Sequence, residues 1–155
     1  MSILTPAFNA EPFLAECIES VLAQTYSHWE HTIVNNCSTD RTLEIARAYA
    51  QRDRRIRVES NDRFIGALEN HNRACSFVAP RSRYCKFLFA DDFLFPTCLA
   101  EMVRLAETHP SVGVVGAYGL RGTRVAWDGL PFPSTVVPGR DLCRATLLHK
   151  TPYVL

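Results

Sequence analysis

The stretch YCKFLFADDFLFP, residues 84–96, decides how the rest of the chain is interpreted. It is an apolar run that ends in two adjacent carboxylates, Asp91 and Asp92, and is followed by a helical pattern. Such a run predicts a buried strand that delivers charge to the edge of a parallel sheet, where open α/β sheets bind ligands. Two neighbouring carboxylates repel each other, and a divalent cation with oxygen ligands relieves that repulsion. The alternative is that one of the two aspartates only caps the following helix.

The composition is that of an ordinary globular domain. The 155 residues suffice for one domain, and 47% hydrophobic residues suffice for a core. Seventeen Lys and Arg residues against 16 Asp and Glu residues give a net charge of +1, which argues against a nucleic-acid-binding surface. The six cysteines include no Cys-x-x-Cys pair, so we expect a reducing, cytoplasmic compartment. No signal peptide and no apolar run long enough to span a bilayer is predicted.

Strands and helices alternate along the first 110 residues. Apolar runs bounded by polar loops predict strands, and apolar residues at helical spacing predict the helices between them. The predicted order is strand 2–5, helix 11–24, strand 29–34, a helix through 43–50, strand 56–59, helix 67–75, the strand before Asp91, and a helix through 99–106. A cap for the second helix is expected among residues 38–40. This order predicts an α/β fold that is Rossmann-like, with a mostly parallel sheet and helices on both faces.

The composition changes after residue 110. Six of the seven glycines lie between Gly113 and Gly139, and three prolines fall within residues 131–138. We expect a fifth strand at 112–117, then hairpins and loops, and then a helix over 139–149. The last residues are apolar without a polar tail, so the C-terminal part is expected to be truncated. The expected organisation is one domain over 1–155, with regular βα units in 1–110 and an incomplete remainder in 111–155.

Polar loops follow three of the predicted strands, at residues 6–9, 35–40 and 90–93. The carboxyl ends of parallel strands line one crevice, so these loops are expected to meet around one ligand. Phe8 can cover a flat ring, Asn36 can pair with the edge of a base through its amide, and the two aspartates can hold a metal or a ribose hydroxyl. The chain has neither a Gly-x-Gly-x-x-Gly motif nor a P-loop, so a bridging metal is expected to hold a diphosphate.

Four ordered blocks resemble the signatures of family 2 glycosyltransferases with the GT-A fold. They are ILTPAFN (3–9), ESVLAQTY (19–26), IVNNCSTD (33–40) and FLFADD (87–92). The resemblance implies transfer of a sugar from a nucleotide-sugar donor to a saccharide or lipid-linked acceptor, with inversion and with Mn²⁺ or Mg²⁺ as cofactor. By position it implies that Asp91 lies near the ribose and that Asp92 is the metal ligand of an Asp-x-Asp motif. The residues implied to border the nucleotide base are Thr5, Pro6, Ala7, Phe8 and Asn36.

The chain departs from the family pattern at several of these positions. Asn35 and Asn36 stand where many members have two aspartates, so Asn36 keeps an acceptor but carries no charge, which leaves the base preference open. Phe89 stands where an earlier aspartate often lies. Asn61, Gly66 and residues 70–73 resemble the region that closes over the donor. Arg73 could meet a phosphate there, although a solvated helix face is the commoner place for an arginine.

No carboxylate of this chain is assigned as the general base. An inverting transfer needs a carboxylate within hydrogen-bond reach of the acceptor hydroxyl. Glu101 and Glu107 are expected on a helix outside the crevice, Asp128 in a turn, and Asp141 at a helix cap. We therefore expect the base beyond Leu155, with this chain as the nucleotide-binding half of a longer enzyme.

Two other functional classes remain open. A non-catalytic nucleotide-sugar-binding module, or an inactive fragment, would keep the donor site without the base. A phospho-receiver domain also carries clustered acids, but residues 6–9 supply none of the acids that it needs after the first strand. The sequence also leaves open whether the protein contacts the inner face of the membrane through the apolar face of its last helix.

Overall fold

The computed structural model describes residues 1–117, 119–126 and 136–148. The chain divides into two compact units, Met1–Ala100 and Glu101–Leu155, and each is described by itself. The organisation into a single domain therefore stays a prediction. The elements that begin in the first unit are β1 (Ser2–Ala7), α1 (Leu14–Leu22), β2 (Glu30–Asn35), α2 (Thr42–Arg52), β3 (Ile56–Ser60), α3 (Ala67–Cys75), β4 (Cys85–Phe87) and α4 (Cys98–Thr108).

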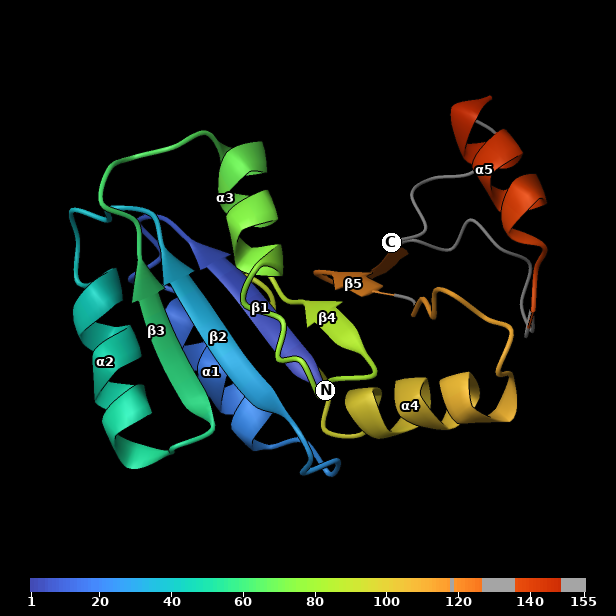
Figure 1. Cartoon of the computed structure of the whole chain (residues 1–155), viewed down its shortest axis with the longest axis horizontal. Coiled ribbons are helices and arrows are strands. Elements are labelled where there is room, and N and C mark those ends of the chain that lie inside the picture. Colours follow the sequence, from blue (N-terminus) through green and yellow to red (C-terminus); the bar gives the residue numbers. More distant parts are fainter. Residues whose placement is uncertain (118, 127–135, 149–155) are drawn as a thin grey trace. The chain divides into compact units, whose positions relative to one another are not determined.

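The first unit is built on a four-stranded parallel sheet. The strand order is β3-β2-β1-β4, so the first strand of the chain lies inside the sheet and the strand before the two aspartates lies at its edge (Figure 1). Ile3 is in register with His31 of β2 and with Lys86 of β4. A parallel sheet whose strands are joined through helices confirms the predicted α/β fold.

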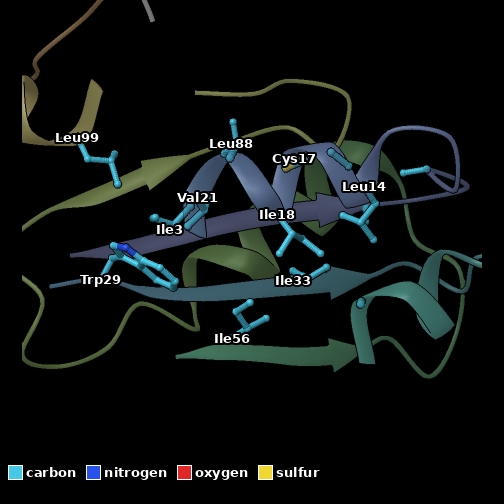
Figure 2. Packing of buried hydrophobic residues seen from close by; sticks show 14 residues of the cluster. Ile3, Leu14, Cys17, Ile18, Val21, Trp29, Ile33, Ile56, Leu88 and Leu99 are labelled. Carbon is cyan, nitrogen blue, oxygen red and sulfur yellow. The ribbon is translucent and has the colours of Figure 1, made fainter. Parts of the chain in front are cut away.

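Helices cover both faces of this sheet. Strand side chains point alternately to opposite faces, so Ile3 and Leu4 of β1 enter two different clusters. The larger cluster contains Ile18 of α1 and Ala46 of α2, and Figure 2 shows the side chains of α1 packed over the sheet. The smaller cluster places Leu4 and Val34 against Ala74 of α3. Because β1 and β2 are buried from both sides, they read as apolar runs rather than as alternating patterns.

Strand β1 is longer than predicted. The proline at position 6 was expected to end the strand at Thr5, but β1 continues through Pro6, which pairs in register with Val34. The even positions of β1 hydrogen-bond toward β4, because Ser2 N–H donates to Tyr84 O and Leu4 O accepts from Leu88 N–H. The missing N–H of Pro6 therefore faces the side where the β4 ladder has already ended at Phe87. Pro6 therefore costs the pairing of β1 with β2 no hydrogen bond.

Strand β4 is shorter and more exposed than the predicted buried strand. It comprises only Cys85–Phe87, paired with Ser2–Leu4, and its first residue is exposed. The next donor that β1 would offer to β4 belongs to Pro6, which has none, so the ladder cannot continue. The apolar character of the following residues serves packing instead, since Leu88 and Ala90 are buried in the larger cluster.

The second unit differs most from prediction. Residues 112–117 are not a strand, and Val114 in their middle is 70% exposed. Gly113 and Gly116 weaken strand propensity, and in the described ranges no other strand pairs with this segment. The expected hairpin is present as β5 (Gly119–Arg121) and β6 (Arg124–Ala126), joined through Gly122 at φ +61°, and α5 spans Gly139–Leu147.

Prolines 131 and 133 and Asp128 lie outside the described residues. A search of the helices in the described part of the chain finds none with the length and apolar character needed to cross a bilayer.

Candidate functional site

The loops after β1 and β2 are fastened to each other. Asn9 N–H donates to Ser38 Oγ at 3.0 Å, and Thr39 N–H donates to Asn9 Oδ1 at 2.9 Å. Asn9 and Cys37 both adopt positive φ, at 48° and 56°, which costs energy for residues other than glycine. Such strain persists only where surrounding contacts fix the backbone, so the two strand ends form a defined edge of the sheet.

Asp40 links this edge to the start of α2. Its Oδ1 accepts from Thr42 N–H at 3.0 Å and its Oδ2 accepts from Glu11 N–H at 3.0 Å. Helix α2 begins at Thr42 and its N-cap residue is Arg41, so the expectation of a cap among residues 38–40 is wrong. The Asp40 carboxylate instead accepts from the first N–H of the helix from one position before the cap, where a negative charge is favourable.

The segment predicted to border a base is mostly buried. Thr5 and Ala7 are 0% and 1% exposed, whereas Phe8 is 48% exposed. Thr5 Oγ1 lies 2.8 Å from Nε2 of the fully buried His31, so its side chain already has a partner inside the protein. Phe8 is thus the member of this segment whose side chain stands in solvent, just beyond the end of β1. Its ring lies 4.9 Å, centroid to centroid, from that of Phe64.

Asn36, at the end of β2, is buried and fully engaged through its oxygen. Its Nδ2 donates to Ile65 O at 2.8 Å, while its Oδ1 accepts from Ile65 N–H at 3.1 Å and from Asn61 Nδ2 at 2.8 Å. Asn61 Nδ2 also donates to Asn70 Oδ1 at 2.8 Å. From the sequence, Asn61 and Asn70 were expected only to belong to the region that closes over the donor. The role of Phe64 and the pairing with Ile65 were not predicted, because no local pattern signals them.

Asp91 and Asp92 follow β4 at the same carboxyl edge, toward which all four arrowheads of the sheet point (Figure 1). Asp92 N–H donates to Phe89 O at 3.0 Å in a turn, and Asp91 is exposed. Helix α4 begins only at Cys98, so the alternative that one of these aspartates caps the next helix is wrong.

Cys17 of α1 shows that the two carboxylates lie near the end of β1. Its Sγ donates to Phe89 O at 3.5 Å. Burial raises the pKa of the Cys17 thiol to about 12, and the charges of Asp92 and Asp91 add to the rise. The Thr5 side chain hydrogen-bonds to the same thiol and acts in the opposite direction on its pKa, so Thr5 of β1 and the two carboxylates after β4 lie around Cys17.

The remaining candidates have other surroundings. The Arg73 guanidinium lies 5.6 Å from the centre of the Phe77 ring, in keeping with a helix-surface position. Glu101 forms an ion pair with Arg104 at 2.8 Å, and Asp141 lies in the first turn of α5. Nothing in these contacts assigns a general base. In the described ranges no group of three or more His, Cys, Asp or Glu side chains is arranged to hold a metal.

Comparison with known proteins places the chain in a family. Residues 2–140 match Glycosyl transferase family 2. EpsE of Bacillus subtilis, which is named as a glycosyltransferase, is 32% identical over 97% of this chain. The chain spans 56% of the length of that relative.

Solved structures share the fold at lower identity. Staphylococcus aureus TarS in complex with UDP has a TM-score of 0.64 at 23% identity, covering 70% of this chain and 32% of that one. The mannosyltransferase PcManGT of Pyrobaculum calidifontis, in complex with GDP-Man and Mn²⁺, has a TM-score of 0.61 at 21% identity, covering 74% and 33%. The sheet, the flanking helices and the matched blocks agree with these comparisons, and the chain belongs to glycosyl transferase family 2.

Proposed function

We propose that this chain is the donor-binding part of an enzyme that transfers a sugar from a nucleotide-diphosphate donor to a saccharide or lipid-linked acceptor. The observation that carries the proposal is the pairing of an exposed aromatic ring, Phe8, with two adjacent carboxylates, Asp91 and Asp92, at one edge of a parallel sheet. Such an edge binds nucleotides in open α/β folds. The family match and the nucleotide-bound neighbours support the same ligand class.

The proposed donor lies across the ends of β1, β2 and β4. The base is bordered by the segment Thr5, Pro6, Ala7 and Phe8, with Phe8 covering its face, and by the region of Asn36. Asp91 accepts from the ribose hydroxyls, and the diphosphate extends toward Asp92. Because Thr5 and Ala7 are buried, their part is to shape the floor beneath the ring of Phe8.

The carboxylate pair fits a divalent cation that arrives with its ligand. Two adjacent aspartates supply too few oxygens for a site built from protein alone, but Mg²⁺ and Mn²⁺ are commonly held by one or two carboxylates together with substrate phosphates. A cation bound by Asp92 would neutralise the diphosphate and stabilise it as the sugar departs. PcManGT was crystallised with Mn²⁺ beside its nucleotide sugar, which supports this choice.

The acceptor half of the reaction is assigned to residues beyond this chain. In the inverting mechanism that we propose, a carboxylate beyond Leu155 removes the proton from the acceptor hydroxyl as that oxygen attacks the sugar. The second candidate is a module that binds the nucleotide sugar without catalysis. It stays a candidate because none of the described carboxylates is assigned as the general base that catalysis needs. A cytoplasmic location is part of the proposal.

Release of nucleoside diphosphate from nucleotide sugars separates the two candidates. The protein is incubated with UDP-, GDP-, dTDP- and CDP-sugars, both with Mn²⁺ and after chelation, and the nucleoside diphosphate that is released is measured. Metal-dependent release from one donor supports the enzyme. Binding without release by this chain, restored when the residues that follow are included, would place the catalytic base there. Binding without release by either form would favour the module.

A further inference from the structure

Asn36 holds a peptide group in the way that a base edge would be held. Its Nδ2 donates to Ile65 O at 2.8 Å and its Oδ1 accepts from Ile65 N–H at 3.1 Å, so the side-chain amide and one residue's backbone form a two-bond pair. The same Oδ1 accepts a second hydrogen bond, at 2.8 Å, from Asn61 Nδ2. An amide oxygen has two lone pairs, and both are used. This oxygen is therefore not available to a nucleobase.

The pair belongs to a buried network that fixes residues 61–66. Asn36, Asn61 and Asn70 are 3%, 9% and 4% exposed, and Asn61 Nδ2 reaches both of the other two side chains. Asn61 N–H also donates to Asn35 O at 3.0 Å. Asn61 Oδ1 is buried and has no hydrogen-bond partner in the part of the chain that the structure describes, so the network tolerates an unpaired oxygen to keep this orientation. Removing one member of such a network leaves buried groups unpaired, which is costly.

The loop held by this network carries an exposed aromatic ring to the proposed site. Phe64, which precedes Ile65, is 59% exposed, and its ring centre lies 4.9 Å from that of Phe8 at an interplanar angle of 60°. The two rings come from different strand ends and form one apolar surface beside polar loops. Adjacent exposed aromatic rings commonly mark ligand sites.

We propose that Asn36 is a positioning residue, which holds Phe64 against Phe8 so that the two rings together form the surface on which the nucleobase rests. The inference rests on the proposed function for the identity of the ligand. It differs from the expectation that Asn36 accepts a hydrogen bond from the base. An amide is required here because a carboxylate at position 36 would set a negative oxygen against Ile65 O and lose the donor.

The variant Asn36→Asp tests this through its pH dependence. A protonated carboxyl group has one donor and one acceptor, like the amide, whereas the ionised group has only acceptors. We expect Asn36→Asp to bind nucleoside diphosphate with Mn²⁺ about tenfold more weakly than wild type at pH 7.5 and to recover toward the wild-type value at pH 5. The two proteins differ at position 36 alone, so every other titratable group is matched, including Cys37, whose Sγ donates to Asn61 O, and wild type measured at each pH is the control. Equal affinities at pH 7.5 would overturn the inference.

A double-mutant comparison distinguishes positioning from direct contact. If Asn36 acts through Phe64, Phe64→Ala should lose about tenfold, and Asn36→Asp combined with Phe64→Ala should lose no more than Phe64→Ala alone. If the loss of affinity in the double variant equals the product of the losses in the two single variants, Asn36 contacts the nucleotide itself. Because Phe64 is exposed, Phe64→Ala should fold and can be tested even if Asn36→Asp does not fold. Wild-type affinity in Phe64→Ala would contradict the proposal that Phe64 forms part of the base-binding surface. Phe95→Ala, at 54% exposure, is the matched control.

A measurement without ligand separates this inference from the proposed function. Nuclear Overhauser contacts between the ring protons of Phe8 and Phe64 are expected in wild type, are expected to weaken in Asn36→Asp at pH 7.5, and are expected to return at pH 5. If wild type bound no nucleotide but these contacts followed Asn36 as described, the proposed function would fail while the positioning role stood. Contacts unchanged in Asn36→Asp at pH 7.5 would refute the positioning role whatever the ligand.

Discussion

Thr5 Oγ1 and His31 Nε2 lie 2.8 Å apart inside the sheet, with both residues 0% exposed. The other ring nitrogen of His31, Nδ1, has no hydrogen-bond partner among the described residues. Burial removes an imidazolium from water without supplying a counter-charge, and it lowers the pKa of His31 to about 4 from 6.5. The neutral ring is therefore the form that the fold accepts inside the sheet, next to the Thr5 hydroxyl.

Stability is expected to fall as the pH is lowered. Between pH 6.5 and about 4 the unfolded chain binds a proton at His31 that the folded chain does not bind, so unfolding is favoured as protons are added. The free energy of unfolding should drop by up to about 3 kcal/mol across this window from this group. Chemical denaturation at several pH values measures the drop. In His31→Leu the free energy of unfolding should depend less on pH in this window, whereas the exposed substitution His28→Gln should leave the pH dependence unchanged. If His31→Leu shows the wild-type pH dependence, the decrease in stability comes from other groups.

Removing the Phe8 ring should weaken nucleotide binding. Phe8 is 48% exposed and its ring contacts another exposed ring, that of Phe64, so Phe8→Ala should leave the fold intact. If the ring covers the base, binding of the diphosphate should weaken by roughly 1 to 3 kcal/mol, as for bases stacked on aromatic side chains. Calorimetry of Phe8→Ala beside Phe95→Ala measures the difference. Equal affinity in the two variants would locate the base away from Phe8.

The two aspartates should differ in their effects on metal dependence. Asp92→Asn should remove the enhancement of nucleotide binding by Mn²⁺, a loss of about tenfold or more, because its carboxylate serves the cation. Asp91→Asn should weaken binding with and without metal alike, because its proposed partner is the ribose. Binding measured with Mn²⁺ and after chelation separates them, with Glu16→Gln on α1 as the control. An enhancement retained in Asp92→Asn contradicts the metal assignment.

The Cys17 thiol, which is buried close to Asp91 and Asp92, should react slowly with alkylating reagents. Because the pKa of Cys17 is raised to about 12, its thiolate is scarce near neutral pH, whereas Cys75 and Cys143 are exposed. Iodoacetamide at pH 8 should therefore modify Cys75 and Cys143 and spare Cys17 in the folded protein. Mass spectrometry of the peptides reads the outcome, and denatured protein is the control. Modification of Cys17 at the rate of Cys75 would show that the site opens in solution.

Much of the fold could be predicted because the signals are local. The apolar runs of β1 and β2 reflect burial on both faces, and the predicted helix 67–75 agrees with α3, Ala67–Cys75. The predicted fifth strand failed for the opposite reason. Residues 112–117 are apolar, but a strand exists only with a partner, and sequence alone does not supply one.

The sequence predicted which strand ends carry the residues of the candidate site, but not the contacts that these residues make with the loop after β3. Phe8 and the aspartate pair fall at strand ends, as their neighbours in sequence indicate. The bond of Asn36 to Ile65 joins residues 29 positions apart, and it depends on the backbone path of a loop. The same path brings Phe64 to Phe8. No periodicity or spacing encodes such contacts, because they arise only once β2, β3 and α3 have packed together.

Calorimetric titration of the chain with uridine, guanosine, thymidine and cytidine diphosphates, each with Mn²⁺ and after chelation, measures whether this sheet edge binds a nucleotide. The folded chain is expected to bind at least one of the four, Mn²⁺ is expected to strengthen this binding, and Asp92→Asn is expected to abolish the enhancement while leaving the unfolding transition unchanged. A folded wild-type chain that binds none of the four, with or without the metal, would contradict the assignment of a nucleotide-sugar site to this sheet edge.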